Sequence, residues 1–115
     1  MNLEKSCIEF HGITIGPGHP CVVIAEAGLN HNGDLEKAKR LIDMAVTCGA
    51  DIVKFQKRTV DILAIQSVLD AKDERFPEFG ETYRQIREHH EFSLDEFALL
   101  KKYCEERKIA FLCTA

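Results

Sequence analysis

Three polar residues stand at the C-terminal ends of two short apolar runs, which is where α/β enzymes place their chemistry. Glu26 follows the run at 21–25, and Lys54 and Gln56 lie in the run at 51–56. Side chains alternate along a strand, so Lys54 and Gln56 should share one face, which is the inside in a barrel. A buried lysine needs an anionic partner. Two compatible partners remain open, a salt bridge to Glu26 and an anionic ligand, and Glu26 could also be a purely structural acid.

Further polar residues surround these strand ends. Asn30 and His31 lie in the loop after the first strand, and Thr114 ends a third apolar run. A single histidine between two asparagines is more typical of a hydrogen-bonding loop residue than of a metal ligand, and no spacing predicts a metal site. Lys57 and Arg58 favour an anionic ligand, although a solvated charge run explains them more readily.

The elements that must position these residues follow from periodicity and capping signals. The nearly continuous β-branched run at 21–25 predicts a strand buried on both faces. Asp34 should cap a helix that ends at Gly49, which argues against a phosphate at that helix N-terminus. The capping box that starts at Ser93 opens a second helix. Apolar stripes predict the buried sides of the two helices: Leu35, Ala38, Leu41, Ile42 and Ala45 in the first, and Leu94, Phe97, Leu100, Tyr103 and Cys104 in the second.

The order of elements predicts an α/β fold. A hairpin at 8–15 comes first, strands follow at 51–56 and 109–114, and a long connection at 57–92 carries only helical hints at 60–69 and 82–90. That connection is too polar for a core segment, and such loops are usually functional. We therefore expect a partial (β/α)8 TIM barrel with the N-terminal hairpin, three parallel strands and two main helices.

Composition excludes several classes of protein. The 115 residues carry a net charge of −4, with basic and acidic residues interleaved, so a nucleic-acid partner is not expected. No stretch reaches the roughly 20 apolar residues that span a bilayer, and the start lacks a signal-peptide pattern, so no membrane association and a cytoplasmic location are expected. The five cysteines lack paired spacing, which predicts reduced thiols.

Two segments together carry a specific resemblance. The stretches IAEAGLNHNGD at 24–34 and GADIVKFQ at 49–56 resemble the start of the N-acetylneuraminate (sialic acid) synthase family. The likeness extends to GPGHP at 16–20, Tyr83, EFS at 91–93 and FLCT at 111–114, and thus covers essentially the whole chain.

The resemblance implies an enzyme that condenses phosphoenolpyruvate (PEP) with N-acetylmannosamine or a related N-acetylated hexose and releases phosphate. It implies catalytic roles for Glu26, Lys54 and Gln56, with Lys54 on the negative charge of PEP. It also implies substrate-binding roles for four further residues, namely Asn30, His31, Tyr83 and Thr114. A divalent metal, Mn²⁺ or Mg²⁺, is implied as well, and its ligands are expected outside this chain.

The resemblance also frames the domain organisation. We expect an N-terminal hairpin and leading segment at 1–20 and the first part of a truncated synthase barrel at 21–115, without the family's C-terminal antifreeze-like domain. The full-length protein should be a homodimer, and the 115 residues alone should be inactive. Two alternatives stay open: a non-catalytic product that pairs with a full-length barrel partner, favoured by exposed sheet edges, and another PEP-using or aldolase-type barrel, which would not explain the two matching segments.

Overall fold

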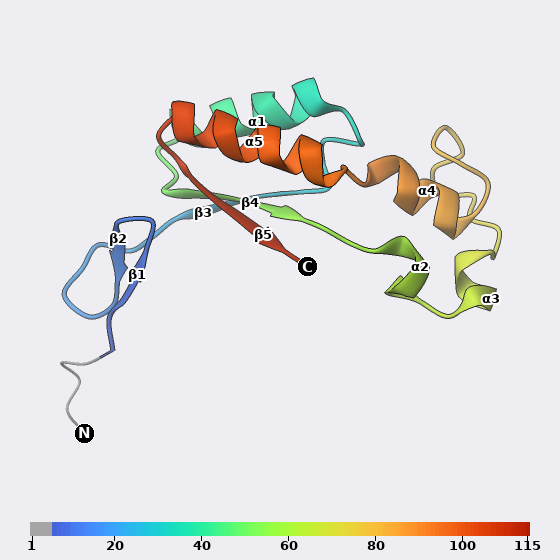
Figure 1. The fold of residues 1–115 in the computed structure, drawn as a ribbon, viewed down its shortest axis with the longest axis horizontal. Helices are drawn as coiled ribbons and strands as arrows, with labels where there is room; N and C mark the ends of the chain where they lie inside the picture. Colours follow the sequence, from blue (N-terminus) through green and yellow to red (C-terminus); the bar gives the residue numbers. More distant parts are fainter. Residues whose placement is uncertain (1–5) are drawn as a thin grey trace.

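Two separate sheets organise the chain (Figure 1). The computed structural model describes residues 6–115, so the start of the predicted leading segment, residues 1–5, lies outside the described residues. The first sheet is the expected hairpin, in which β1 (Ile8–Phe10) pairs antiparallel with β2 (Ile13–Ile15). Its two turn residues have φ of 49° at His11 and 78° at Gly12, which suits the right-handed twist of a tight hairpin.

The second sheet carries the strands on which the candidate site depends. Its order is β3 (Ile24–Gly28), β4 (Ile52–Gln56) and β5 (Ala110–Thr114), and neighbouring strands are parallel. Helices α1 (Leu35–Thr47) and α5 (Leu94–Glu106) both lie on one face of this sheet (Figure 1). The predicted α/β architecture with a parallel sheet is therefore confirmed.

The first strand differs from its prediction in extent and in burial. The ladder begins at Ile24 rather than at 21, and the side chains of Val23 and Ile24 are 53% and 46% exposed. Residue 23 is held by Asp51 instead, whose Oδ2 accepts from the Val23 amide at 2.8 Å. The expectation of burial on both faces was wrong because, among the described residues, α1 and α5 cover only one face of the sheet, and Ile24 and Glu26 point to the other face.

Both main helices begin where their capping residues predict. The Asp34 side chain accepts from the backbone N of Lys37, and Ser93 forms the full capping box with Glu96. The one error in the stripes is Leu94, which is 76% exposed. Leu94 opens α5 and lies roughly 90° around the helix from the centre of the buried side. The shared core between helices and sheet consists of Ala27, Ala38, Ile42, Ala45, Val53, Phe55, Phe92, Phe97, Leu100, Cys104 and Ile109.

The connection at 57–92 is more ordered than its polarity predicts. It forms three short helices, α2 (Val60–Leu63), α3 (Gln66–Leu69) and α4 (Tyr83–His90). Each helix buries one apolar side chain: Val60, Leu69 and Ile86. The expectation that this segment contributes no core was therefore wrong. Short helices can bury a single side chain each without showing a clear apolar period in the sequence.

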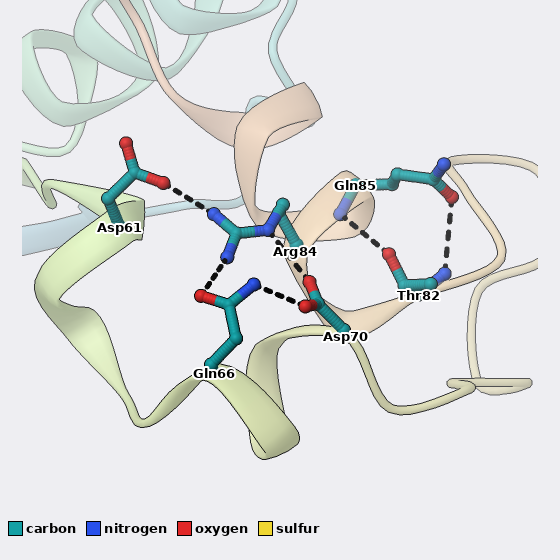
Figure 2. A network of polar contacts seen from close by, with 6 residues as sticks. All are labelled: Asp61, Gln66, Asp70, Thr82, Arg84 and Gln85. Carbon is teal, nitrogen blue, oxygen red and sulfur yellow. Dashed lines mark hydrogen bonds and ion pairs between the residues drawn. The ribbon is translucent and has the colours of Figure 1, made fainter.

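A single arginine joins these short helices (Figure 2). The Arg84 guanidinium donates to Asp61 of α2 at 2.5 Å, to Asp70 after α3 at 3.0 Å, and to Gln66 Oε1 at 3.3 Å. Its side chain is only 19% exposed. Next to it, the Thr82 hydroxyl and the Gln85 side chain close the capping box of α4. The long connection is therefore a folded unit held around Arg84.

Candidate active site at the strand ends

The predicted salt bridge between neighbouring strands is present. Glu26 and Lys54 are register partners on β3 and β4, and Lys54 Nζ lies 2.6 Å from Glu26 Oε2. The side chain of Lys54 is 27% exposed and that of Glu26 is 48% exposed. Because the pair is partly exposed, solvent screens its attraction only in part, and Glu26 holds the Lys54 ammonium in place. The exposed side of the pair remains open to a ligand.

Gln56 and Thr114 extend the same row of polar side chains. They are register partners on β4 and β5, and Lys54 pairs with Leu112 two positions earlier. Phe55, between Lys54 and Gln56, is fully buried beneath the helices, so alternation places Lys54 and Gln56 on the opposite face. We call this row the polar face, and its members are Glu26, Lys54, Gln56 and Thr114.

A small cavity opens at the end of the polar face. It has a volume of about 170 Å³ and is lined by Gln56, Lys57, Arg58, Thr114 and Ala115. The Thr114 hydroxyl donates to the Phe55 carbonyl oxygen at 3.4 Å. The cavity brings a hydroxyl, an amide and two cationic side chains to one place, which is a donor-rich setting suited to oxygen-bearing ligands.

The interpretation of Lys57 and Arg58 as a solvated charge run is contradicted. Both residues are half-buried, and the Glu91 carboxylate binds them from the far end of the long connection. Glu91 Oε2 accepts from the Arg58 backbone N at 2.9 Å and lies 3.4 Å from Lys57 Nζ. Arg58 Nη2 donates to Gln56 Oε1 at 2.8 Å. The sequence indicated Arg58 as one of the basic residues that favour an anionic ligand but gave it no assigned role, and it did not predict the contact with Glu91, because no local signal connects positions so far apart.

His31 lies in the core rather than on a surface. It is 0% exposed, and its ring stacks on Phe92 with the ring centres 4.1 Å apart. Its Nδ1 accepts a hydrogen bond from the Gly33 amide at 3.1 Å. Burial, followed by the nearby His90, lowers the pKa of His31 to about 4. The histidine is thus neutral near pH 7 and orders the first loop, which confirms the prediction that it is a hydrogen-bonding loop residue.

The structure places Asn30 and Tyr83 away from the polar face. Asn30 is exposed and lines a cavity of about 350 Å³ together with Phe79 and Arg87 of the long connection. Tyr83 opens α4, where the Arg87 guanidinium lies 4.7 Å from the centre of its ring. The structure thus brings four of the predicted site residues together, and it places Asn30, His31 and Tyr83 elsewhere, where their substrate-binding roles stay predictions.

Within residues 6–115, no group of three or more His, Cys, Asp or Glu side chains could hold a metal ion. All five cysteines are free, as predicted, and burial raises the pKa of Cys104 to about 12. No helix within residues 6–115 has the length and apolar character needed to cross a membrane.

Known proteins are similar to this chain in sequence and in fold. N-acetylneuraminate-9-phosphate synthase of Homo sapiens is 43% identical over 100 residues, which are 87% of this chain and 28% of that protein. N,N'-diacetyllegionaminic acid synthase of Legionella pneumophila is 38% identical over 101 residues, covering 86% of this chain and 28% of that one. The crystal structure of N-acetylneuraminic acid (sialic acid) synthetase from Leptospira borgpetersenii, in complex with citrate, superimposes with a TM-score of 0.69. That match is 34% identical and covers 93% of this chain and 33% of that chain.

The fold and these relatives define part of a (β/α)8-barrel synthase, as the sequence predicted. The chain spans between a quarter and a third of the length of these relatives. The model of the NeuB family matches residues 41–115. The chain belongs to the NeuB family, an enzyme family whose members here are synthases of sialic acid and related sugar acids.

Proposed function

We propose that the chain is part of an enzyme that condenses PEP with N-acetylmannosamine or a related N-acetylated hexose. In the proposed reaction, C3 of PEP forms the new carbon–carbon bond with the sugar aldehyde, water supplies an oxygen at C2, and inorganic phosphate leaves. The relatives named as sialic acid and legionaminic acid synthases support this class of product. The polar face is the observation that carries the proposal for this chain. Gln56 and Thr114 end their strands on the side where barrel enzymes bind substrate, and Glu26 and Lys54 lie in the middle of theirs on the same face.

The proposed roles follow from the chemistry of each group. Lys54 would bind a negative charge of PEP, and Glu26 would hold the Lys54 ammonium in place at 2.6 Å. Gln56 would bind the sugar or PEP, and Thr114 would provide a contact from β5. Electrostatic positioning of this kind is usually the largest contribution to catalysis.

The remaining predicted residues take secondary parts in the proposal. His31 and Asn30 would shape the first loop, and Tyr83 would act through the long connection. A divalent metal, Mn²⁺ or Mg²⁺, would polarise the sugar aldehyde when bound. The residues described here do not provide its ligand set, so none of the roles proposed for this chain depends on metal coordination. A homodimeric full-length protein and a cytoplasmic location also remain predictions.

One observation favours a second candidate, a non-catalytic chain that pairs with a barrel partner. The open edge at β3 borders an apolar groove of about 290 Å³, lined in part by Val23, Leu41 and Met44. Val23 and Met44 are 53% and 62% exposed. An unpaired strand beside an apolar groove is a surface on which another polypeptide can add a strand and bury apolar area.

A phosphate-release assay with PEP, N-acetylmannosamine and Mn²⁺ tests the proposal. It should be run on this chain and on a longer protein that contains it, with Lys54→Ala in each. We expect turnover in the longer protein only, and a loss of at least about a hundredfold with Lys54→Ala, roughly 3 kcal/mol of transition-state stabilisation. Near-normal activity of the variant would remove Lys54 from the site. If neither protein releases phosphate with any of several N-acetylated hexoses, the result would favour the non-catalytic candidate.

A further inference from the structure

Arg58 connects the polar face to the long connection. It lies two residues after Gln56, and its Nη2 donates to Gln56 Oε1 at 2.8 Å. Its own backbone N donates to Glu91 Oε2 at 2.9 Å, so the backbone of Arg58 is fixed while its side chain reaches back to the strand end. The Glu91 side chain is only 11% exposed, so this is an anchored contact and not a surface pair.

The chemistry of the guanidinium decides which way the Gln56 amide faces. Arginine has only donors, so the atom of Gln56 that meets Arg58 must be the oxygen. With the amide reversed, two sets of N–H groups would face each other, and the buried guanidinium would lose an acceptor. The Arg58 contact therefore fixes the amide orientation on chemical grounds.

This orientation leaves the amide nitrogen of Gln56 for a ligand. Within residues 6–115, Gln56 Nε2 makes no hydrogen bond, and Gln56 lines the 170 Å³ cavity with Thr114. Lys54 Nζ, a second donor, belongs to the same strand two positions earlier and faces the same side. Two donors along one strand suit an acceptor oxygen of a ligand, such as a carboxylate, phosphoryl, carbonyl or hydroxyl oxygen.

We propose that Arg58 and Glu91 are positioning residues that hold the Gln56 carboxamide with its oxygen toward Arg58. Gln56 then offers only N–H donors to an acceptor oxygen of the ligand. The inference rests on the proposed function insofar as the polar face binds substrate. Glu91 acts through the backbone of Arg58, and Arg58 acts through the Gln56 oxygen. Neither residue needs to touch the reacting atoms.

NMR on the 115-residue chain tests this without substrate, so its result is independent of whether PEP binds. We expect a through-hydrogen-bond coupling between Arg58 Nη2 and the Gln56 side-chain carbonyl carbon, and slow motion of the Gln56 Nε2 group. Arg58→Met keeps the length of the side chain but removes every donor, and it should abolish the coupling and mobilise the amide. Glu91→Ala should mobilise the amide in part, whereas Glu91→Gln, which keeps an acceptor oxygen, should restore much of its order.

The control is Arg40→Met, which removes an exposed arginine of α1 and should leave the Gln56 signals unchanged. Backbone amide signals of β4 should stay in place in all four variants, which separates lost positioning from lost folding. A Gln56 amide that is equally ordered in Arg58→Met and in the wild type would overturn the proposal. If the amide behaves as expected but the longer protein turns over neither PEP nor an N-acetylated hexose, the proposed function fails and the positioning role stands.

Discussion

The two connections that follow β3 and β4 are held by opposite means. The short connection at 29–34 is organised around His31, which is fully buried and stacked on Phe92. The long connection at 57–92 is organised around Arg84, which binds Asp61 and Asp70 with side chains that are 81% and 50% exposed. Burial of a ring in a packed core stabilises strongly, whereas ion pairs with exposed partners each contribute little.

The short connection should therefore be the more rigid of the two and the long connection the more mobile. His31 of the short connection stacks on Phe92, which belongs to the core between the helices and the sheet, so this connection should unfold only with the whole domain. The long connection has its own small helices, joined by ion pairs and hydrogen bonds, so it should open locally at a lower free energy than the whole domain needs to unfold. The two meet where Gly33 lies against the carbonyl oxygen of His89. The rigid connection thus provides a support for the adjustable one.

The largest expected effect comes from breaking that meeting point with Gly33→Ala. Gly33 has φ of 73°, and an added Cβ would overlap the His89 carbonyl oxygen, which is backbone and cannot rotate away. We expect a loss of about 2–4 kcal/mol in the free energy of unfolding. Gly49→Ala is the matched control, because Gly49 has φ of 75° but open space around it. Gly49→Ala should lose only about 1 kcal/mol of unfolding free energy in chemical denaturation. Equal losses in the two variants would show that the His89 carbonyl does not restrict residue 33.

The pH dependence of stability should reveal the burial of His31. Its pKa is lowered to about 4 in the folded chain and lies near 6.5 when unfolded, so the unfolded chain binds the proton more tightly. The stability that depends on a neutral His31 is fully present above pH 6.5 and is lost as the pH falls toward 4, by about 3 kcal/mol in total. His31→Phe fills a similar volume without titrating, so its unfolding free energy should fall less over this range. Parallel pH profiles of the two proteins would contradict the buried neutral ring.

Arg84→Ala removes the side chain that joins the helices of the long connection, and it should have a smaller effect on stability. The variant leaves Asp61 and Asp70 without their cation and should lower the local stability of α2 and α3. Hydrogen exchange should accelerate at residues 60–69, while the amides of β4 keep their protection. Arg40→Ala, an exposed arginine on α1, serves as the control. Uniform acceleration throughout the chain would mean that the long connection does not open by itself.

Added salt should have the smallest effect on local stability, and the two connections should respond to it differently. At about 1 M salt the Debye length falls to about 3 Å, so the exposed pairs of Arg84 weaken while the stacked His31 does not respond. We expect slightly faster hydrogen exchange at residues 60–69 and no change at residues 29–34. An equal response of both segments to salt would remove the distinction between them.

The parts of the fold that were predictable depend on local rules. Asp34 and Ser93 were recognised as caps because a capping side chain bonds to an amide three residues away. The pairing of Glu26 with Lys54 was also predictable, since alternation along parallel strands restricts which side chains can meet. The burial of His31 against Phe92 had no local signal, because the two residues come together only when the helices pack on the sheet.

Period, caps and motif are local properties of the chain, so the amino-acid sequence was enough to predict the α/β class, the family resemblance and the strands that carry Glu26, Lys54, Gln56 and Thr114. Three contacts were visible only in the folded chain: Glu91 accepts from the Arg58 backbone, Arg58 donates to the Gln56 side-chain oxygen, and Arg84 of α4 binds Asp61 and Asp70. The contacts of Glu91 with Arg58 and of Arg84 with Asp61 join residues far apart in the chain, and the Arg58 side chain that meets Gln56 extends from the backbone that Glu91 holds. Their partners are selected by the packing that brings them within hydrogen-bonding distance, which no spacing in the sequence records.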